Sequence, residues 1–299
     1  MNAADLKVFE AVARLGGMNR ATSELNTVQS NVTARIRQLE NELGTPLFHR
    51  HSRGVTPTQA GRRLLPYAAR VGLLLAEARR AVEDDGTPKG PLGIGSLETT
   101  AGLRLPPVLA SFAAAYPEVD IMLKTGTTCE LVAEVLEHRL EAAFVCGPVD
   151  HPELDEQTVF REELVLVTAR SVRSLDALVA KGDLKIIVFR AGCSYRQRLD
   201  DILAARGILG VRRLDFGSIE GILGCVAAGV GVTLLPKGVV GPAWRDGRVA
   251  VHELPLADRR VDTVTIRRRD AFVSSALTAF LQCAAPPTGA GERSAVAAE

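Results

Sequence analysis

The stretch NRATSELNTVQSNVTARIRQLENE, residues 19–42, decides the fold of the N-terminal region. It predicts two short helices joined by a tight turn at residues 26–28, with Asn19 as the cap of the first helix. In the second helix, apolar residues recur at intervals of 4, 3 and 4 and therefore share one face: Val32, Ile36, Leu39 and Leu43. The opposite face is polar, so this helix has one side for a core and another for a partner.

The polar face of the second predicted helix suits entry into the major groove of DNA. Its first turn is small and polar, so the backbone can approach the base edges and amide side chains can read them. The side chains of this turn are Gln29, Ser30, Asn31 and Thr33. A surface helix of any small α-helical domain is the alternative, and the sequence that follows decides between the two.

The segment TPLFHRHSRGVTP, residues 45–57, predicts a small hairpin, or wing, with a basic tip. Arg50 and Arg53 at this tip are expected to face phosphates or a minor groove. Residues 1–80 hold 12 Lys or Arg and 6 Asp or Glu, a net charge of +6, and the remaining 24 basic and 29 acidic residues give −5. A basic end on an acidic body indicates that this end meets a polyanion.

A long helix is predicted from Thr58 onward, and it carries an apolar seam at heptad spacing. The seam consists of Leu64, Ala68, Val71, Leu75, Ala78 and Val82. An exposed seam of this kind needs a partner, so residues 59–86 are expected to form a linker and dimerisation helix. Packing against the chain's own body is the alternative, and Pro66 is expected to kink the helix.

From Pro91 onward, strands alternate with helices, one of which is expected to run from Thr99 to Tyr116. This alternation predicts an α/β body with a mostly parallel sheet and helices on both faces. Two such sets joined by crossing strands form a cleft, where small ligands bind at strand ends and helix N-termini. Residues 284–299 are rich in Ala, Pro and Gly and are expected to be a disordered tail.

The composition argues against several classes of protein. Apolar residues make up 46% and charged residues 24%, and no run of about 18 apolar residues occurs, so neither a membrane span nor a membrane partner is expected. The five cysteines are scattered and lie apart from the five histidines, which indicates no metal site, no cofactor and a reducing cytoplasm. No P-loop, nucleophile elbow or dinucleotide-binding loop is present, so an enzyme is not expected.

The chain resembles the LysR-type transcriptional regulators over nearly its whole length. The family's LE-x-x-LG-x-x-LF-x-R signature and its T-x-x-G are present as Leu39, Glu40, Leu43, Gly44, Leu47, Phe48, Arg50, Thr58 and Gly61. The segments PPVLASFAAAYPEVDIML and AAGVGVTLLP are similar to the family's effector domain. The resemblance implies an N-terminal all-α winged helix-turn-helix at residues 1–58. It also implies a two-lobed, periplasmic-binding-protein-like (type 2) effector domain at residues 91–283, with lobe I at about 91–160 and 265–283 and lobe II at about 161–264.

The same resemblance implies a bacterial, cytoplasmic, sequence-specific regulator controlled by a small anionic metabolite. Its expected partners are double-stranded DNA, the effector and further copies of itself, as a dimer through the linker helix and as a tetramer, and the family allows RNA polymerase as well. The expected DNA-binding residues are Arg20, Gln29, Ser30, Asn31, Thr33, Arg35, Arg37, Arg50 and Arg53. The chain departs from the family pattern at Val28, Ser30 and Ala34, which puts the operator bases in question rather than DNA binding itself.

The effector-binding residues are expected in loops that follow strands of both lobes. They are Ser96, Glu98, Thr99, Thr100, Thr127, Thr128 and Cys146 in one lobe, and Cys193, Ser194, Tyr195, Arg196, Ser218 and Thr233 in the other. Ser194 is predicted to cap a helix whose free amides, beside Arg196, would favour a carboxylate. Ordinary turn and cap chemistry is the alternative explanation for these residues.

Two further functions stay open at this stage. A thiol at a helix N-terminus has a lowered pKa, so Cys193 could serve a thiol-based redox-sensing regulator. Against this, the nearest downstream cysteine, Cys225, lies beyond a predicted helix and strand, and a disulfide switch needs a partner within reach. A purely architectural DNA-binding protein would not need a cleft-forming body.

Overall fold

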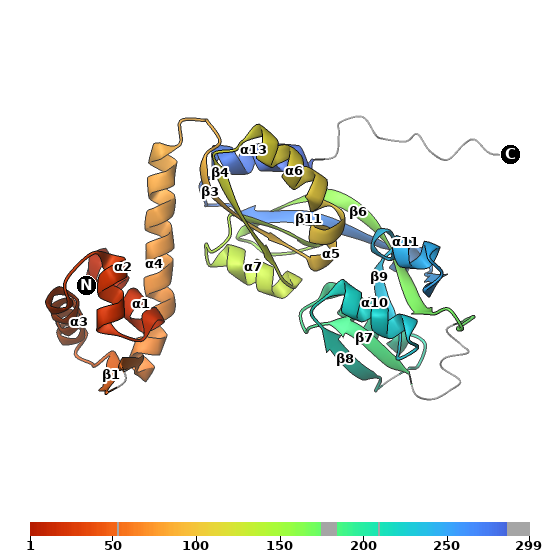
Figure 1. The fold of residues 1–299 in the computed structure, drawn as a ribbon, viewed down its shortest axis with the longest axis horizontal. Helices are drawn as coiled ribbons and strands as arrows, with labels where there is room; N and C mark the ends of the chain where they lie inside the picture. Colours follow the sequence, from red (N-terminus) through yellow and green to blue (C-terminus); the bar gives the residue numbers. More distant parts are fainter. Residues whose placement is uncertain (53, 175–183, 209, 286–299) are drawn as a thin grey trace. The chain divides into compact units, whose positions relative to one another are not determined.

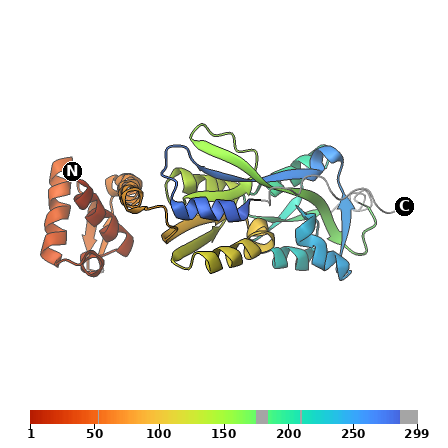
Figure 2. The same cartoon turned by 90° about the horizontal axis from the view of Figure 1, so that it is seen from above.

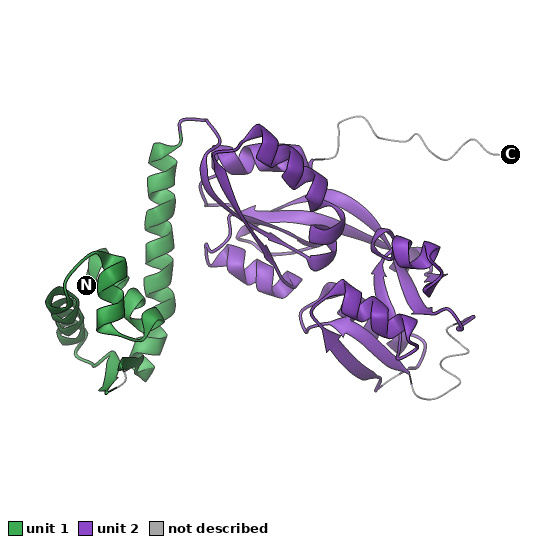
Figure 3. Ribbon diagram, viewed as in Figure 1, with its two compact units in different colours: residues 1–84 green, residues 85–299 purple. Residues whose placement is uncertain are grey.

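In the computed structural model, residues 1–52, 54–174, 184–208 and 210–285 are described, and the chain forms two compact units (Figures 1 and 3). The first unit is Met1–Asp84 and the second is Asp85–Glu299. Arg53 and residues 286–299 of the predicted tail lie outside the described residues. Each unit has its own hydrophobic core, so each is considered by itself below.

The first unit is a helix-turn-helix followed by a hairpin and a long helix. Its elements are α1 (Ala3–Leu15), α2 (Met18–Leu25), α3 (Gln29–Leu43), β1 (Phe48–His51), β2 (Gly54–Pro57) and α4 (Gln59–Glu83). The predicted apolar stripe of α3 is confirmed, because Val32, Ile36 and Leu39 are completely buried in one cluster with Phe9 of α1. Leu43, at the end of the helix, is exposed.

The carboxylate of Glu40 joins α3 to the wing. It accepts the backbone N–H of Leu47 at 2.8 Å and that of Phe48 at 3.2 Å, and it forms an ion pair of 3.5 Å with Arg50. All four residues belong to the signature in the sequence. The signature therefore encodes a carboxylate that satisfies backbone donors in the chain entering the hairpin.

The Thr-x-x-Gly pair fixes the start of α4 against the same turn. The Thr58 hydroxyl accepts the N–H of Gly61 at 3.0 Å and donates to the Pro46 carbonyl at 2.8 Å, while the Thr58 N–H donates to the Leu47 carbonyl at 2.9 Å. A Cβ on Gly61 would lie 2.3 Å from the Leu47 carbonyl oxygen. Glycine is therefore required here by the close approach of two backbone segments.

One prediction for the first unit needs correction. Helix α2 begins at Met18 after the extended residue Gly17, so Asn19 lies in its first turn and is not the cap. Helix α4 continues through Pro66 as one element, as the prediction of a single long helix requires. The seam of α4 is divided: Ala68 is buried in the first unit's core, whereas Leu75 and Val82 are exposed.

The second unit alternates strands with helices as predicted, over a longer list of elements. These are β3 (Gly90–Ser96), α5 (Glu98–Leu103), α6 (Leu105–Ala115), β4 (Val119–Thr125), α7 (Thr128–Leu136), β5 (Ala142–Cys146), β6 (Leu154–Ala169), β7 (Lys185–Phe189), α9 (Ser194–Ala204), β8 (Arg212–Phe216), α10 (Ile219–Ala227), β9 (Thr233–Pro236), α11 (Lys237–Arg245), β10 (Val249–Glu253), α12 (Leu256–Arg259), β11 (Arg260–Arg268) and α13 (Ser275–Ala284). Three of these elements, α11, β10 and α12, were not predicted from the sequence. The predicted helix from Thr99 to Tyr116 is two helices, because Pro106 and Pro107 lack the N–H groups that would continue α5.

The sheet of the second unit is mixed, so the prediction of a mostly parallel sheet is wrong. Strand β3 pairs in parallel with β4 and β5, and β7 pairs in parallel with β8 in a separate two-stranded sheet. Strand β11, however, is antiparallel to β5 and β6, and β9 and β10 are antiparallel to β6. The long strands β6 and β11 run through both lobes and join them (Figure 2).

The first lobe has three layers (Figure 1). Helices α6 and α13 cover one face of its sheet, where Phe112 and Phe280 pack edge to face with ring centroids 5.2 Å apart. Helix α7 packs on the other face against β5 and β11. This packing holds the carboxyl ends of β3 and β4, from which α5 and α7 begin, in a fixed arrangement.

We expect Gly61→Ala to destabilise the first unit by about 1–3 kcal/mol, the usual cost of forcing extra atoms into a packed site. The added Cβ would press on a backbone oxygen, which cannot move away as a flexible side chain would. Gly72→Ala on the same helix is the matched control, since nothing lies within 4 Å of its Cβ position, and it should stabilise the helix by about 0.5–1 kcal/mol. Urea unfolding followed by circular dichroism measures both. Equal effects would contradict the close-approach argument.

Candidate functional site

A groove on the first unit is lined by α2, α3 and the wing. Four of the predicted DNA-binding residues line it together: Arg20, Gln29, Thr33 and Arg50. The wing is fixed beside α1 because the Val55 N–H donates to the Gly16 carbonyl at 3.1 Å. Gly54 has φ +137° and would place a Cβ 2.4 Å from that same oxygen, so the wing depends on glycine at this position.

The other predicted DNA-binding residues differ in whether their side chains already make contacts within the unit. Ser30 and Arg37 are exposed on α3, and the Asn31 amide donates to the Thr27 hydroxyl at 2.8 Å. Arg35 lies within 3.0 Å of Asp5, a buried carboxylate that also caps α1 with Asn2. The structure thus gives Arg35 a role in holding α1 and α3 together. Arg53 lies outside the described residues.

A pocket in the second unit lies at the carboxyl ends of four parallel strands. Strands β3 and β4 reach it from one lobe and β7 and β8 from the other. Its lining residues are Leu97, Glu98, Thr99, Thr125, Gly126, Thr127, Phe189, Arg190, Cys193, Tyr195 and Gly217. Ligands of open α/β sheets bind at such strand ends, so this is the candidate binding site of the unit.

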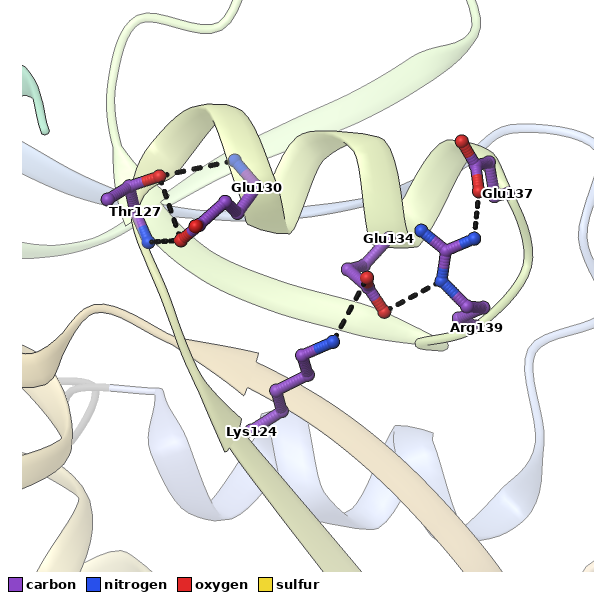
Figure 4. A network of polar contacts seen from close by, with 6 residues as sticks. All are labelled: Lys124, Thr127, Glu130, Glu134, Glu137 and Arg139. Atoms are coloured by element: carbon purple, nitrogen blue, oxygen red, sulfur yellow. Dashed lines mark hydrogen bonds and ion pairs between the residues drawn. The ribbon is translucent and has the colours of Figure 1, made fainter. Parts of the chain in front are cut away.

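One wall of the pocket is the capped start of α7 (Figure 4). The Glu130 carboxylate accepts the Thr127 N–H at 2.8 Å and its hydroxyl at 3.1 Å, and the Thr127 hydroxyl accepts the Glu130 N–H. The pKa of Glu130 is therefore lowered, chiefly by the Thr127 N–H bond, and Arg190 and Lys124 add to this. The capping box already satisfies the Thr127 N–H and leaves that donor unavailable to a ligand.

Two hydroxyl pairs connect the lobes at the pocket. The Thr99 and Tyr195 hydroxyl oxygens lie 3.4 Å apart, and the Ser194 hydroxyl donates to that of Thr128 at 3.1 Å. Burial raises the pKa of Tyr195 far above its ordinary value, so its hydroxyl keeps its proton and can donate a hydrogen bond. The relative position of the lobes is therefore coupled to the groups around the pocket.

The structure brings together some of the predicted effector residues and not others. Those that line the pocket are Glu98, Thr99, Thr127, Cys193 and Tyr195. Those that lie outside its lining are Ser96, Thr100, Thr128, Cys146, Ser194, Arg196, Ser218 and Thr233. Ser96 bonds to the backbone of its neighbour, and Ser218 caps α10 through the Gly221 N–H, which is the ordinary cap chemistry that the sequence left open.

The basic residue of the pocket is Arg190, which is not among the residues predicted from the sequence. Arg196, the predicted one, is held by Asp215, with its Nη1 3.3 Å from both carboxylate oxygens. Ser194 is the first residue of α9 and Cys193 is its cap, so the predicted cap position was off by one. Arg190 directly follows the apolar run Lys185–Phe189, and its position at a strand end was the available signal.

Cys193 is buried, and burial raises its pKa even though the Arg196 and Tyr195 amides act in the opposite direction. The neighbouring Cys146 thiol is also buried, and its pKa is raised for the same reason. A protonated thiol is a poor nucleophile towards oxidants. The environment of Cys193 therefore favours a packing role over redox chemistry.

Comparison with known proteins identifies the family. Residues 3–62 match the bacterial regulatory helix-turn-helix protein of the lysR family, and residues 85–286 match the LysR substrate binding domain. The chain belongs to the LysR family. It is 43% identical over 281 residues to the HTH-type transcriptional regulator GltR of Bacillus subtilis, covering 94% of this chain and 95% of GltR. It is 41% identical over 282 residues to the HTH-type transcriptional regulator CzcR of Bacillus cereus, covering 94% of this chain and 96% of CzcR.

Solved LysR-family structures share the fold. CbnR in complex with its target DNA has a TM-score of 0.66 and 24% identity, covering 95% of this chain and 99% of CbnR. A full-length OxyR variant from Pseudomonas aeruginosa has a TM-score of 0.66 and 18% identity, covering 95% of this chain and 94% of OxyR. This LysR-family chain is accordingly a DNA-binding transcriptional regulator with an effector-binding domain, not an enzyme. Among its described helices, none is long and apolar enough to cross a membrane.

We expect Glu130→Gln to destabilise this LysR-family protein at neutral pH by roughly 0.5–2 kcal/mol, the range for losing a helix cap. The folded-state pKa of Glu130 is lower than its ordinary value of 4.5. Its contribution is therefore present above pH 4.5 and is lost as the pH falls through the folded-state pKa. Thermal unfolding of both proteins from about pH 7 to about pH 3 should show the difference shrinking on acidification. A difference independent of pH would contradict the assignment.

Proposed function

We propose that this regulator is controlled by a small metabolite with an anionic group, bound in the pocket between the two lobes. The observation that carries the proposal is the pocket itself, which draws on four strand ends from two lobes and includes the exposed guanidinium of Arg190. Arginine binds carboxylates and phosphates through a planar, two-pronged set of donors. A ligand that touches both lobes stabilises one relative position of them over others.

We propose further that the groove of the first unit binds operator DNA through α3. All four predicted residues line the groove; in this proposal Gln29 and Thr33 read base edges, and Arg20 and Arg50 contact phosphates. Val28, the residue before α3, offers no side-chain cap and is 65% exposed. The operator would accordingly differ from those of relatives with a serine there.

Exposed apolar residues on α4, which include Leu75 and Val82 of the seam, support dimerisation. Tyr67, Leu74, Leu75 and Val82 are all large apolar residues that are exposed on this helix. A second copy would cover them, which agrees with the proposed dimer through residues 59–86. Tetramer formation and contact with RNA polymerase are extensions of this proposal that rest on the family alone.

We expect Arg20→Ala to weaken binding to specific and scrambled DNA by a similar factor. Loss of one phosphate contact should also lower the slope of log affinity against log salt concentration by about 0.9 for each contact. Arg14→Ala is the matched control: it removes the same charge from an arginine that Glu10 and Glu24 hold outside the groove. Fluorescence anisotropy over a salt series measures both. An equal change of slope in the two variants would indicate net charge rather than contact.

Gln29→Ala should act differently, because an amide that reads a base contributes to discrimination. We expect it to reduce preference for the operator over single-base variants by about 1–3 kcal/mol at the position that Gln29 reads. Its salt slope should stay that of the unaltered protein. Anisotropy competition against a set of operator variants measures this, and a uniform loss at every position would show that Gln29 contacts no base.

We expect Arg190→Ala to abolish effector-dependent change in DNA binding while leaving ligand-free DNA affinity intact. The control is Arg173→Ala, which removes an exposed arginine of the same unit from outside the pocket. The measurement is thermal stabilisation of each variant across carboxylates, phosphates and amino acids, followed by anisotropy with any compound that stabilises. A fully retained response in Arg190→Ala would refute the anion site.

A further inference from the structure

We infer that the effector is an amino acid, whose carboxylate pairs with Arg190 and whose ammonium group pairs with Glu98. This inference rests on the proposed function of the pocket and adds the chemical class of its ligand. It starts from the pocket's two charged lining residues, which come from opposite lobes: Glu98 begins α5, and Arg190 follows β7. An amino acid carries the complementary charges on a single molecule.

Glu98 needs a cation that the protein does not supply. It is half-buried at the pocket, and within the described part of the chain its carboxylate has neither an ion pair nor a hydrogen bond. A partly dehydrated carboxylate without a partner is unfavourable. Two other glutamates of the unit, by contrast, are paired: Glu162 with Arg104 at 2.7 Å and Glu163 with Arg259 at 2.9 Å.

The Arg190 guanidinium is likewise available to bind a ligand. It lies close enough to Glu130 to lower the pKa of that carboxylate, but the described residues show no ion pair within 4 Å for its guanidinium. Glu130 is instead bound by Thr127, whose N–H and hydroxyl both donate to Oε2 of Glu130. The fork of Arg190 can therefore turn to a ligand carboxylate.

The uncharged residues that line the pocket also suit a zwitterionic ligand such as an amino acid. The hydroxyls of Thr99 and Tyr195 can complete the hydrogen bonds of a polar head group, and Leu97 and Phe189 offer apolar surface for a side chain. A simple monocarboxylate would leave Glu98 unpaired. A dicarboxylate would place a second negative charge near Glu98 and Glu130, which like-charge repulsion disfavours.

The test is thermal stabilisation of the full-length protein by matched probes. The probes are the standard α-amino acids and a series of ω-amino acids, each compared with the carboxylic acid that lacks its amino group and the amine that lacks its carboxylate. We expect at least one amino acid to stabilise the protein and both of its truncated analogues to bind at least tenfold more weakly. A carboxylic acid that binds as tightly as its amino acid would overturn the inference.

Glu98→Gln provides the second arm, with Glu220→Gln as its matched control. Both substitutions neutralise a carboxylate in the first turn of a helix of the same unit, and only Glu98 lines the pocket. We expect Glu98→Gln to weaken amino acid binding at least tenfold and Glu220→Gln to leave it unchanged. An unaltered ligand-free unfolding temperature shows that the second unit of each variant is folded. An unchanged amino acid affinity in Glu98→Gln would refute the pairing.

The outcomes separate this inference from the proposal beneath it. If carboxylates or phosphates stabilise the protein through Arg190 and amino acids do not, the ligand class is wrong and the anion site stands. If no probe of any class stabilises the protein or changes its DNA binding, both are refuted.

Discussion

The turn at residues 44–47 is the constraint on which the DNA-binding unit depends. Its backbone polar groups need hydrogen-bond partners within the protein. Glu40, which precedes the turn in the sequence, accepts the Leu47 N–H, and Thr58, which follows it, donates to the Pro46 carbonyl. Gly61 allows the two segments to meet. Because the same turn contacts the end of α3, the start of β1 and the start of α4, it fixes the orientation of the recognition helix relative to the wing. A regulator that reads bases needs that orientation to be rigid.

The second unit needs flexibility rather than rigidity, because an effector acts by changing the conformation of the protein that binds it. Its lobes are joined by the long antiparallel strands β6 and β11, whose pairing is irregular between Thr263 and Val264. Across the pocket itself the lobes meet through polar pairs such as Thr99 and Tyr195. A ligand that bridges the pocket would favour one relative position of the lobes over others.

Local patterns predicted much of this fold. The stripe of α3, the wing and most strand positions follow from short-range periodicity and turn chemistry, which act within a few residues. The predictions that failed concern contacts between residues that lie far apart in the sequence. Antiparallel pairing of β6 with β11 joins residues about a hundred positions apart, and no local pattern records strand direction. The α4 seam is apolar as predicted, yet half of it packs on its own unit, because a heptad pattern does not specify which surface will cover it.

The pocket shows the same limit at the level of single side chains. Arg196 and Arg190 are equivalent in the sequence, as two arginines near a predicted helix start. What separates them is Asp215, which lies on the neighbouring strand β8 and neutralises Arg196. Glu98 differs from Glu130 in the same way, because the start of α7 satisfies Glu130 and nothing described satisfies Glu98. Availability for a ligand is thus a property of what the rest of the fold leaves unpaired. Two side chains of opposite charge that lie on facing lobes without a described partner therefore indicate the charges of the ligand better than either residue does alone.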